Sequence, residues 1–300
     1  MTKNPPASLL QRLRNEARRK GISYQQEQML FCHPEFLRRL SRSVYRDHLI
    51  LKGGLFLYLV TDCESRPTLD ADYLLHRPGN SEENIRKMLS AILQNSSPFE
   101  FVKFSIRSVT SITANRLYHG FQAKLDVTIM NERVRLNIDI GVGDTIVPSP
   151  QKLDLKTIPG DGELVTVLSY SVESLIAEKY DAFVLRMELF SHMKDIYDIV
   201  FLSQTRCFDG ELLQKAIAET LQKRGTPHDA RTFRRLSDLR DSSVMRKKWS
   251  NFRAHMNLKS DEWGFDLVMQ RFGEFLEPPV TAMVNGLTFS QAWDCESGWA

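Results

Sequence analysis

Alternation of apolar and polar residues divides the chain into a strand-rich middle with helices on either side. Near the start, Ser8-Leu-Leu-Gln-Arg-Leu and Phe36-Leu-Arg-Arg-Leu place apolar residues at helical spacing, which predicts two helices within 7–47. Residues 81–94 also read as a helix, with Ser81 as N-cap and Glu83 in the first turn. Period-two alternation predicts strands at about 48–52, 69–75, 101–109, 121–130 and 133–141, the last two joined by a hairpin turn at 131–132.

The second half of the chain has a helical pattern. After Pro148 and Pro150 comes a loop that contains Pro159-Gly-Asp-Gly162, which predicts a domain boundary near 150–170. Helices are then expected at 172–189, 194–203, 210–224 and 232–255. The whole pattern predicts an α+β protein in three parts: N-terminal helices over 1–47, a strand-rich core over 48–165 and a helical domain over 166–300.

Composition is that of an ordinary globular protein. The chain has 300 residues, of which 42% are hydrophobic and 26% charged. No apolar run reaches the roughly 18 residues of a membrane span, and the N-terminus lacks the apolar core of a secretory signal. The cysteines stand singly, without a Cys-x-x-Cys pair, so a zinc site or a disulfide framework is not expected and a cytoplasmic location is; they are Cys32, Cys63, Cys207 and Cys295.

The most informative stretch combines a glycine pair with two carboxylates. A strand ends at Lys52, Gly53 and Gly54 follow, and after a short apolar helix the chain returns as a strand that carries Asp70 and Asp72. Residues i and i+2 of a strand point to the same side, so the two carboxylates repel each other unless a cation lies between them. Mg²⁺ binds carboxylates together with substrate phosphates, and a glycine turn before a helix can hold those phosphates. The layout indicates nucleotidyl transfer; a tight turn beside surface carboxylates is the alternative.

Asp139 is the candidate third carboxylate. It interrupts an alternating apolar strand in Leu136-Asn-Ile-Asp139-Ile-Gly-Val-Gly-Asp144. On a neighbouring strand it could serve as a further metal ligand or as a base for the acceptor hydroxyl. The alternative is an aspartate paired with a local arginine, either Arg133 or Arg135.

Two helical motifs add candidate residues. Lys179, in Ala-Glu-Lys-Tyr-Asp, could neutralise charge on a triphosphate, although a helical lysine is more often solvated. Asp195 and Asp198 stand at i and i+3, on one side of a helix, where acids commonly pair with lysines.

Taken in order, these motifs resemble the AbiEii/AbiGii toxin family of DNA-polymerase-β-like nucleotidyltransferases. The resemblance covers about residues 48–203 and is closest over 140–150 and 173–199. It implies a polymerase-β-like nucleotidyltransferase core with a mixed sheet, followed by an α-helical C-terminal domain. It further implies a toxin of a toxin–antitoxin or abortive-infection system, a cognate antitoxin from the same operon, an NTP substrate, and an RNA acceptor such as the 3′ end of tRNA.

The resemblance also implies residue roles. Gly53 and Gly54 would form the nucleotide-binding turn, and Asp70 and Asp72 would bind Mg²⁺, with Mn²⁺ as an alternative. Lys179 would contact the triphosphate, and Asp195 would be the acid of the last motif. We add as weaker nucleotide contacts Lys52, Arg66, Lys194 and Asp198. Gly54 stands where the wider superfamily often has serine, and the interval from Gly54 to Asp70 is longer than usual.

Charge is uneven along the chain. Residues 201–260 hold 13 Lys and Arg against 6 Asp and Glu, a difference of +7, whereas the whole chain has a net charge of +3. A basic helical block is compatible with an RNA partner, and a solvated helical surface is the alternative. An acceptor hydroxyl on a protein or small molecule, or a non-catalytic binding module, also remains open. The intact pair of Asp70 and Asp72 argues against the binding module, because without catalysis nothing favours two repelling acids side by side.

Overall fold

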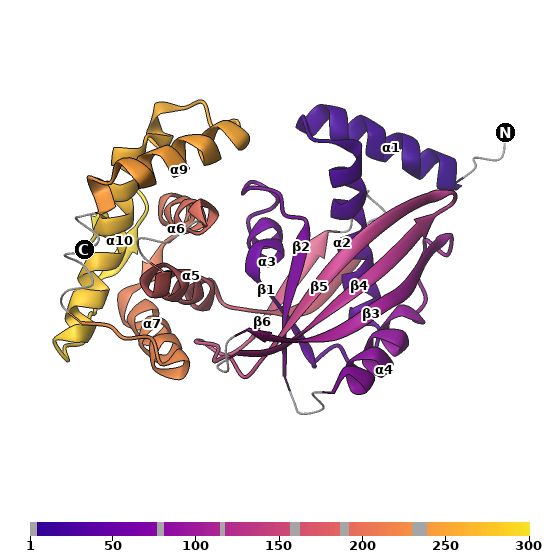
Figure 1. Ribbon diagram of the computed structural model, residues 1–300, viewed down its shortest axis with the longest axis horizontal. Helices are drawn as coiled ribbons and strands as arrows, with labels where there is room; N and C mark the ends of the chain where they lie inside the picture. The colour runs from indigo at the N-terminus through magenta and orange to yellow at the C-terminus, as the bar shows by residue number, and fades with distance from the viewer. Residues whose placement is uncertain (1–4, 77–80, 115–117, 157–162, 187–191, 230–238) are drawn as a thin grey trace. The chain divides into compact units, whose positions relative to one another are not determined.

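The computed structural model describes residues 5–76, 81–114, 118–156, 163–186, 192–229 and 239–300, and the chain forms two compact units. The first unit comprises Met1–Asp144 and Pro150–Tyr170, and the second comprises Thr145–Ser149 and Ser171–Ala300. Each is described by itself below, with the element labels of Figure 1. Among the described helices, none is both long and apolar enough to cross a bilayer.

The described residues of the first unit form four helices and the strands of one sheet. Its elements are α1 (Pro5–Lys20), α2 (Tyr24–Ser41), β1 (Leu49–Lys52), α3 (Gly53–Val60), β2 (Asp70–Leu75), α4 (Glu82–Leu93), β3 (Val102–Ala114), β4 (Tyr118–Ile129), β5 (Glu132–Val142), β6 (Gln151–Lys156) and β7 (Leu164–Ser169). The expected pair of N-terminal helices and the expected hairpin are therefore confirmed, although the hairpin turn is at residues 130–131 and not at 131–132. Ser81 caps α4 as predicted, because its hydroxyl accepts a hydrogen bond from the Asn84 N–H at 3.2 Å.

The sheet is mixed, as predicted, and has seven strands in the order β3-β4-β5-β2-β1-β7-β6. Strand β2 pairs parallel with β5 and β1 pairs parallel with β7, whereas the remaining neighbours are antiparallel. Strands β6 and β7 correct the sequence analysis, which expected only a loop after Pro150. The prolines and glycines around these segments favoured a loop prediction, although each segment forms a strand of six residues.

One side of the sheet is packed and the other is polar. In Figure 1, α2 lies behind β4 and β5, and the Phe36 ring of α2 packs against Tyr73 of β2 with ring centroids 5.7 Å apart. The β5 residues facing this side are buried, namely Val134, Leu136, Ile138 and Ile140. Because strand residues alternate, Asp70, Asp72 and Asp139 lie on the opposite side. We call this opposite side of β2, β5, β4 and β3 the polar face.

The second unit is mainly helical, as predicted. Its elements are α5 (Val172–Arg186), α6 (Met193–Thr205), β8 (Phe208–Asp209), α7 (Gly210–Arg224), α9 (Ser243–His255), η2 (Asp261–Trp263), α10 (Phe265–Val284), β9 (Ala292–Asp294) and β10 (Gly298–Trp299). Helix α9 begins at Ser243, where Ser242 caps it, and Leu239 and Arg240 before it are also helical; residues 230–238, which include the expected start at 232, lie outside the described part. The period analysis had not predicted α10 or the small sheet β10-β9-β8.

Candidate active site

The turn between β1 and α3 brings the glycine pair against a carboxylate. Gly53 has a φ of +65°, which disfavours residues with a side chain. A Cβ at this position would also lie 2.1 Å from Oδ2 of Asp72, so glycine is required on two separate grounds. The first N–H groups of a helix have no partner within it and can bind an anion. The Asp72 carboxylate thus lies beside a set of backbone donors suited to phosphate.

Three predicted carboxylates share the polar face. Asp72 of β2 is in register with Asp139 of β5, and Asp70 lies two residues before Asp72. Asp70 is exposed, and Asp72 and Asp139 are partly buried. The structure resolves the alternative for Asp139, which accepts a hydrogen bond from Nε2 of Gln122 at 3.1 Å rather than pairing with Arg133 or Arg135.

These carboxylates do not form a closed metal cage. In the part of the chain that the structure describes, no three His, Cys, Asp or Glu side chains are close enough to hold a metal ion together. This arrangement still suits Mg²⁺, which usually binds one or two carboxylates and takes its other ligands from water and substrate phosphates. Asp70 and Asp72, adjacent to the glycine turn, are the residues that fit such an ion.

Thr68 and Arg66 lie beside Gly54. A Cβ on Gly54 would be 3.0 Å from the Thr68 hydroxyl oxygen and 3.6 Å from Nη2 of Arg66. The Arg66 guanidinium is therefore at the same turn as the glycine pair, where the sequence analysis expected a phosphate contact. Thr68 was not predicted; its hydroxyl fills the space into which a side chain at position 54 would project.

Lys52 forms an ion pair that the sequence did not reveal. Its Nζ lies 2.8 Å from Oδ2 of Asp144 and 5.0 Å from the centroid of the Tyr170 ring. The side chains of Lys52 and Asp144 are 12% and 11% exposed, so both are largely withdrawn from solvent. Lys52 thus joins the end of β1 to the turn after β5, and Asp144, which ends the Asp139 motif, is a site residue that sequence reasoning missed.

A buried histidine supports the start of β2. Nε2 of His33, on α2, donates a hydrogen bond to the Leu69 carbonyl at 3.2 Å, directly before Asp70. Burial lowers the pKa of His33 to about 4, although the Leu69 carbonyl and the Asp70 charge act in the opposite direction. The imidazole is therefore neutral at neutral pH and holds the backbone next to the first carboxylate.

The second unit holds the other predicted residues. Nζ of Lys179, on α5, lies 2.8 Å from Oδ1 of Asp195 and 2.7 Å from Oδ2 of Asp198, both on α6. Lys179 is buried, and the Asp198 side chain is fully buried. Burial alone would raise the pKa of Asp195, but the Lys179 ammonium outweighs it and leaves that pKa below its ordinary value of 3.8. The three residues form a charged link between the two helices.

The remaining predicted residue, Lys194, is exposed next to this link. His192 immediately before α6 accepts a hydrogen bond at Nδ1 from Nη1 of Arg186 at 2.7 Å. Partial burial lowers the pKa of His192, and the neighbouring cations act in the same direction. The structure thus collects the predicted residues into one cluster in each unit: glycines and carboxylates in the first, Lys179, Asp195, Asp198 and Lys194 in the second.

Many cations of the basic block have partners within the second unit. Arg224 pairs with Glu178 and Asp181 at 2.7 and 3.0 Å. Arg246 makes two contacts of 2.7 Å with Asp266, and Arg253 donates to the carbonyls of Leu258 and Ser260. Glu178, Asp181 and Asp266 all lie outside the window used for the charge count. Three further cations of the block fall outside the described residues: Arg231, Arg234 and Arg235.

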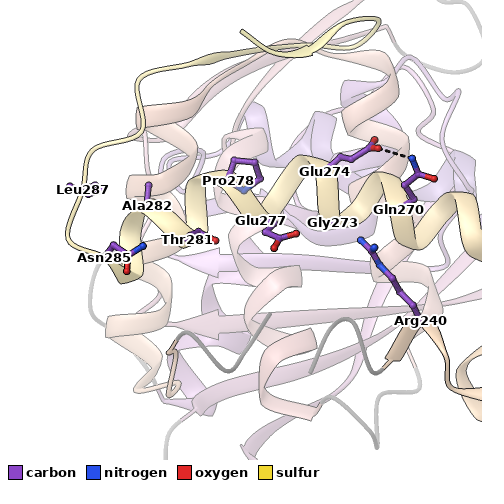
Figure 2. A pocket seen from close by; sticks show the side chains of 10 residues that line it. All are labelled: Arg240, Gln270, Gly273, Glu274, Glu277, Pro278, Thr281, Ala282, Asn285 and Leu287. Carbon is purple, nitrogen blue, oxygen red and sulfur yellow. Dashed lines mark hydrogen bonds between the residues drawn. The ribbon is translucent and has the colours of Figure 1, made fainter. Parts of the chain in front are cut away.

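A hollow of about 660 Å³ lies along α10 and contains none of the predicted residues (Figure 2). Arg240 enters it beside Gly273, where a Cβ would lie 2.2 Å from the Arg240 Nη2. Glu274 accepts a hydrogen bond from Gln270 at 2.8 Å, and Nη2 of Arg240 donates to the Met269 carbonyl at 3.3 Å. The chemistry of the candidate site is therefore found at the glycine turn and not in this hollow.

Comparison with known proteins adds a family match. The profile of a family described as nucleotidyl transferase AbiEii toxin, type IV TA system, matches residues 35–271, which is more than half of the chain. Crystal structures that align with this chain include Helicobacter pylori JHP933, which is 14% identical, with a TM-score of 0.48 over 87% of this chain and 94% of that one. Another from H. pylori, described as a candidate nucleotidyltransferase, is 15% identical, with a TM-score of 0.46 over 86% and 96%. No curated protein matches this chain significantly.

Proposed function

This chain belongs to the AbiEii family of nucleotidyl transferase toxins of type IV toxin–antitoxin systems, and we propose that it transfers nucleotides from an NTP to tRNA with Mg²⁺ as its cofactor. Membership in the family makes it a nucleotidyltransferase of the EC 2.7.7 class, with an NTP as substrate and an antitoxin as partner. The metal, the acceptor and the residue roles are our proposal. The tRNA 3′ end is the acceptor that the family resemblance suggests.

One observation carries the proposal: the Asp72 carboxylate packs against Gly53 on the side of the sheet that also bears Asp70 and Asp139. The start of α3 places backbone N–H donors, which suit phosphate, next to carboxylates, which suit a divalent cation. An NTP bound with a divalent cation satisfies both, since its phosphates accept from the N–H groups and the cation neutralises the acids.

The roles of the first unit follow from this placement. Gly53 and Gly54 would donate backbone N–H groups to the phosphates, and the Arg66 guanidinium would add charge at the same turn. Asp70 and Asp72 would hold Mg²⁺, which when bound stabilises charge on the triphosphate and makes the acceptor hydroxyl more acidic. Asp139 is the candidate third ligand or base. The acceptor oxygen forms a bond to the α-phosphorus, the α–β phosphoanhydride bond breaks, and pyrophosphate leaves.

We assign Lys52 and the second cluster supporting roles. The ion pair of Lys52 with Asp144 would fix the glycine turn, in addition to any phosphate contact. Lys179, which pairs with Asp195 and Asp198, would stabilise charge on the leaving pyrophosphate. Lys194 is exposed and could reach phosphate directly.

The test is incubation of the protein with each labelled NTP, Mg²⁺ and total tRNA, followed by a denaturing gel. We expect label on RNA with at least one NTP, and loss of that label with EDTA. Asp70→Ala should lower labelling by about 10³-fold or more while leaving the thermal unfolding temperature unchanged or raised, because it removes one of two repelling acids.

Asp47→Ala is the matched control, since Asp47 is exposed and outside the site. It should label RNA like the unmodified protein. Normal labelling by a folded Asp70→Ala variant would refute the assignment of the carboxylate pair. Label found on protein or on a small molecule, with none on RNA, would replace tRNA as the acceptor while retaining the transferase chemistry.

A further inference from the structure

The polar face extends from the candidate carboxylates across three strands. Asp139 and Asn137 of β5 are followed on this face by Arg135 and Arg133. In register with them on β4 are Gln122, Lys124, Asp126 and Thr128, and on β3 Lys103 is opposite Thr128. Directly opposed residues of antiparallel strands share a side of the sheet, so all of these lie on one surface. That surface begins at the carboxylates and ends at the β4–β5 hairpin.

This surface carries exposed cations without acidic partners. Lys103, Lys124, Arg133 and Arg135 are exposed, and among the described residues none of the four has a carboxylate within ion-pair distance. Asp126, opposite Arg135, is already engaged by Arg107 through contacts of 3.0 and 2.7 Å. The contrast with the basic helices of the second unit is clear, because Arg224, Arg246 and Arg253 are occupied by intramolecular partners.

The spacing of these cations suits a phosphodiester chain. Successive residues on one side of a strand are about 6.6 Å apart, which is comparable to the distance between phosphates in an extended single strand. From Asp139 to Arg133 is six residues, or about 20 Å along β5. Amide and hydroxyl groups of Asn137 and Thr128 lie among the cations and can bond to sugar and phosphate oxygens.

We propose that the acceptor RNA binds along the polar face, with its phosphates over Lys124, Arg133 and Arg135 and its 3′ end at Asp70, Asp72 and Asp139. The proposal rests on RNA being the acceptor, as proposed above. It moves the RNA path from the basic helical block, where the charge count placed it, to the sheet that holds the carboxylates. The cations bind the backbone and carry no base specificity, so the track would accept many sequences.

The experiment compares two charge-reversal pairs that each change the net charge by the same amount. One pair, Lys124→Glu with Arg135→Glu, lies on the polar face. The control pair, Arg86→Glu with Lys87→Glu, lies on exposed positions of α4. Binding of 5′-fluorescein-labelled total tRNA is followed by anisotropy at several salt concentrations, together with nucleotide transfer and the KM for NTP.

We expect the polar-face pair to weaken tRNA binding at least tenfold at about 0.1 M salt. The log–log salt slope should fall by about 1.4, because each lost contact to a single strand contributes about 0.7. The KM for NTP should stay unchanged, and the α4 pair should bind and transfer like the unmodified protein. If the polar-face pair is unstable, Lys124→Gln with Arg135→Gln should still reduce the slope.

A further pair, Lys247→Glu with Lys248→Glu on α9, tests the basic helical block. Three results would overturn the proposal: tRNA binding and salt slope unchanged in both the Glu and the Gln polar-face pairs, equal weakening by the α4 pair, or weakening confined to the α9 pair. Each of these results is compatible with tRNA as the acceptor but shows that tRNA does not bind along the polar face. If the unmodified protein neither binds nor labels tRNA, the proposed acceptor itself is wrong, which is a separate result from misplacing it.

Discussion

The contact between Gly53 and Asp72 is the tightest constraint on a single residue of the site. Gly53→Ala would place a methyl group 2.1 Å from Oδ2 of Asp72, in a backbone conformation that alanine also disfavours. We expect destabilisation of about 1 kcal/mol or more, and loss of transfer by about 10²-fold because Asp72 must move. Chemical denaturation and the transfer assay measure the two effects.

Gly21 provides the matched control for that substitution. Its φ of +67° is nearly the same as that of Gly53, but nothing lies within 4 Å of a Cβ built on it. Gly21→Ala should therefore lower the free energy of unfolding only through the unfavourable positive φ, and nucleotide transfer should be retained. Equal loss of transfer in both variants would show that the effect is general destabilisation and not displacement of Asp72.

Side-chain positions near the glycine turn could be predicted from the sequence where they depend only on local backbone geometry. The shared side of Asp70 and Asp72 follows from strand periodicity, and the helix start at Gly53 follows from the glycine pair. The Lys52–Asp144 pair joins residues 92 positions apart, and Gln122 reaches Asp139 only through strand register. Neither contact could be read from spacing along the chain.

At the scale of elements, Lys179 joins α5 to α6. Lys179→Met removes the ammonium that pairs with Asp195 and Asp198, which should lower the free energy of unfolding by about 3–5 kcal/mol. If Lys179 also stabilises the leaving pyrophosphate, transfer by the protein that remains folded should fall by about 10²-fold or more. Urea unfolding and transfer at low temperature separate the two effects.

Lys194→Met is the stability control, because Lys194 is exposed at the start of α6, beside the two aspartates, and its loss should change the free energy of unfolding by no more than about 0.5 kcal/mol. If folded Lys179→Met transfers at the normal rate with the normal KM for NTP, Lys179 has only the structural role. If its stability matches that of Lys194→Met, the ion pair contributes little to holding the helices together.

His33 makes the support of β2 sensitive to pH. Its pKa is about 4 in the folded protein and 6.5 ordinarily, so between these values the unfolded chain binds a proton that the folded chain does not. Stability should therefore be complete above pH 6.5 and fall by up to about 3 kcal/mol as the pH drops to 4. His33→Gln should flatten this part of the curve, measured by urea unfolding at pH 4.5 and 6.5. An unchanged curve would mean that His33 titrates normally.

Helices were predicted better than strands because their signals are local. The helix over 210–224 was placed correctly, with Asp209 accepting from the Leu212 N–H at its start and Gly225 left-handed at its end. Strands β6 and β7 were missed, since their stability comes from pairing with each other and with distant β1. Strand order and the parallel pairing of β2 with β5 depend on such long-range contacts, so the period of apolar residues could not predict them.

For the whole molecule, the net charge of a sequence window did not show which cations are left without acidic partners in the fold. The window 201–260 appeared strongly basic because Glu178, Asp181 and Asp266, which neutralise its arginines, fall outside it. The cations of the polar face are spread over β3, β4 and β5 and never form a run in the sequence. Sheet register, which sequence analysis could not supply, brings them together.

Ligand binding should stabilise the whole molecule in a way that depends on the site carboxylates. An NTP at 100 times its Kd stabilises the folded state by about 2.7 kcal/mol, so NTP with Mg²⁺ should raise the thermal unfolding temperature. EDTA, or the paired change Asp70→Ala with Asp72→Ala, should remove the Mg²⁺-dependent part. Scanning fluorimetry measures both. An equal rise with and without Mg²⁺ would show that the nucleotide binds independently of a metal.

The position of the Thr68 hydroxyl has a consequence for the history of the site. A Cβ on residue 54 would lie 3.0 Å from that oxygen, so a serine at 54 would require the Thr68 hydroxyl to move by a few tenths of an ångström. Where the wider superfamily places a hydroxyl on the turn itself, this chain supplies one from the segment leading into β2. The two positions should therefore covary among relatives, with serine at 54 accompanied by a smaller residue at 68. A serine introduced at 54 before any change at 68 would have to displace the Thr68 hydroxyl, whereas a smaller residue at 68 would make room for it.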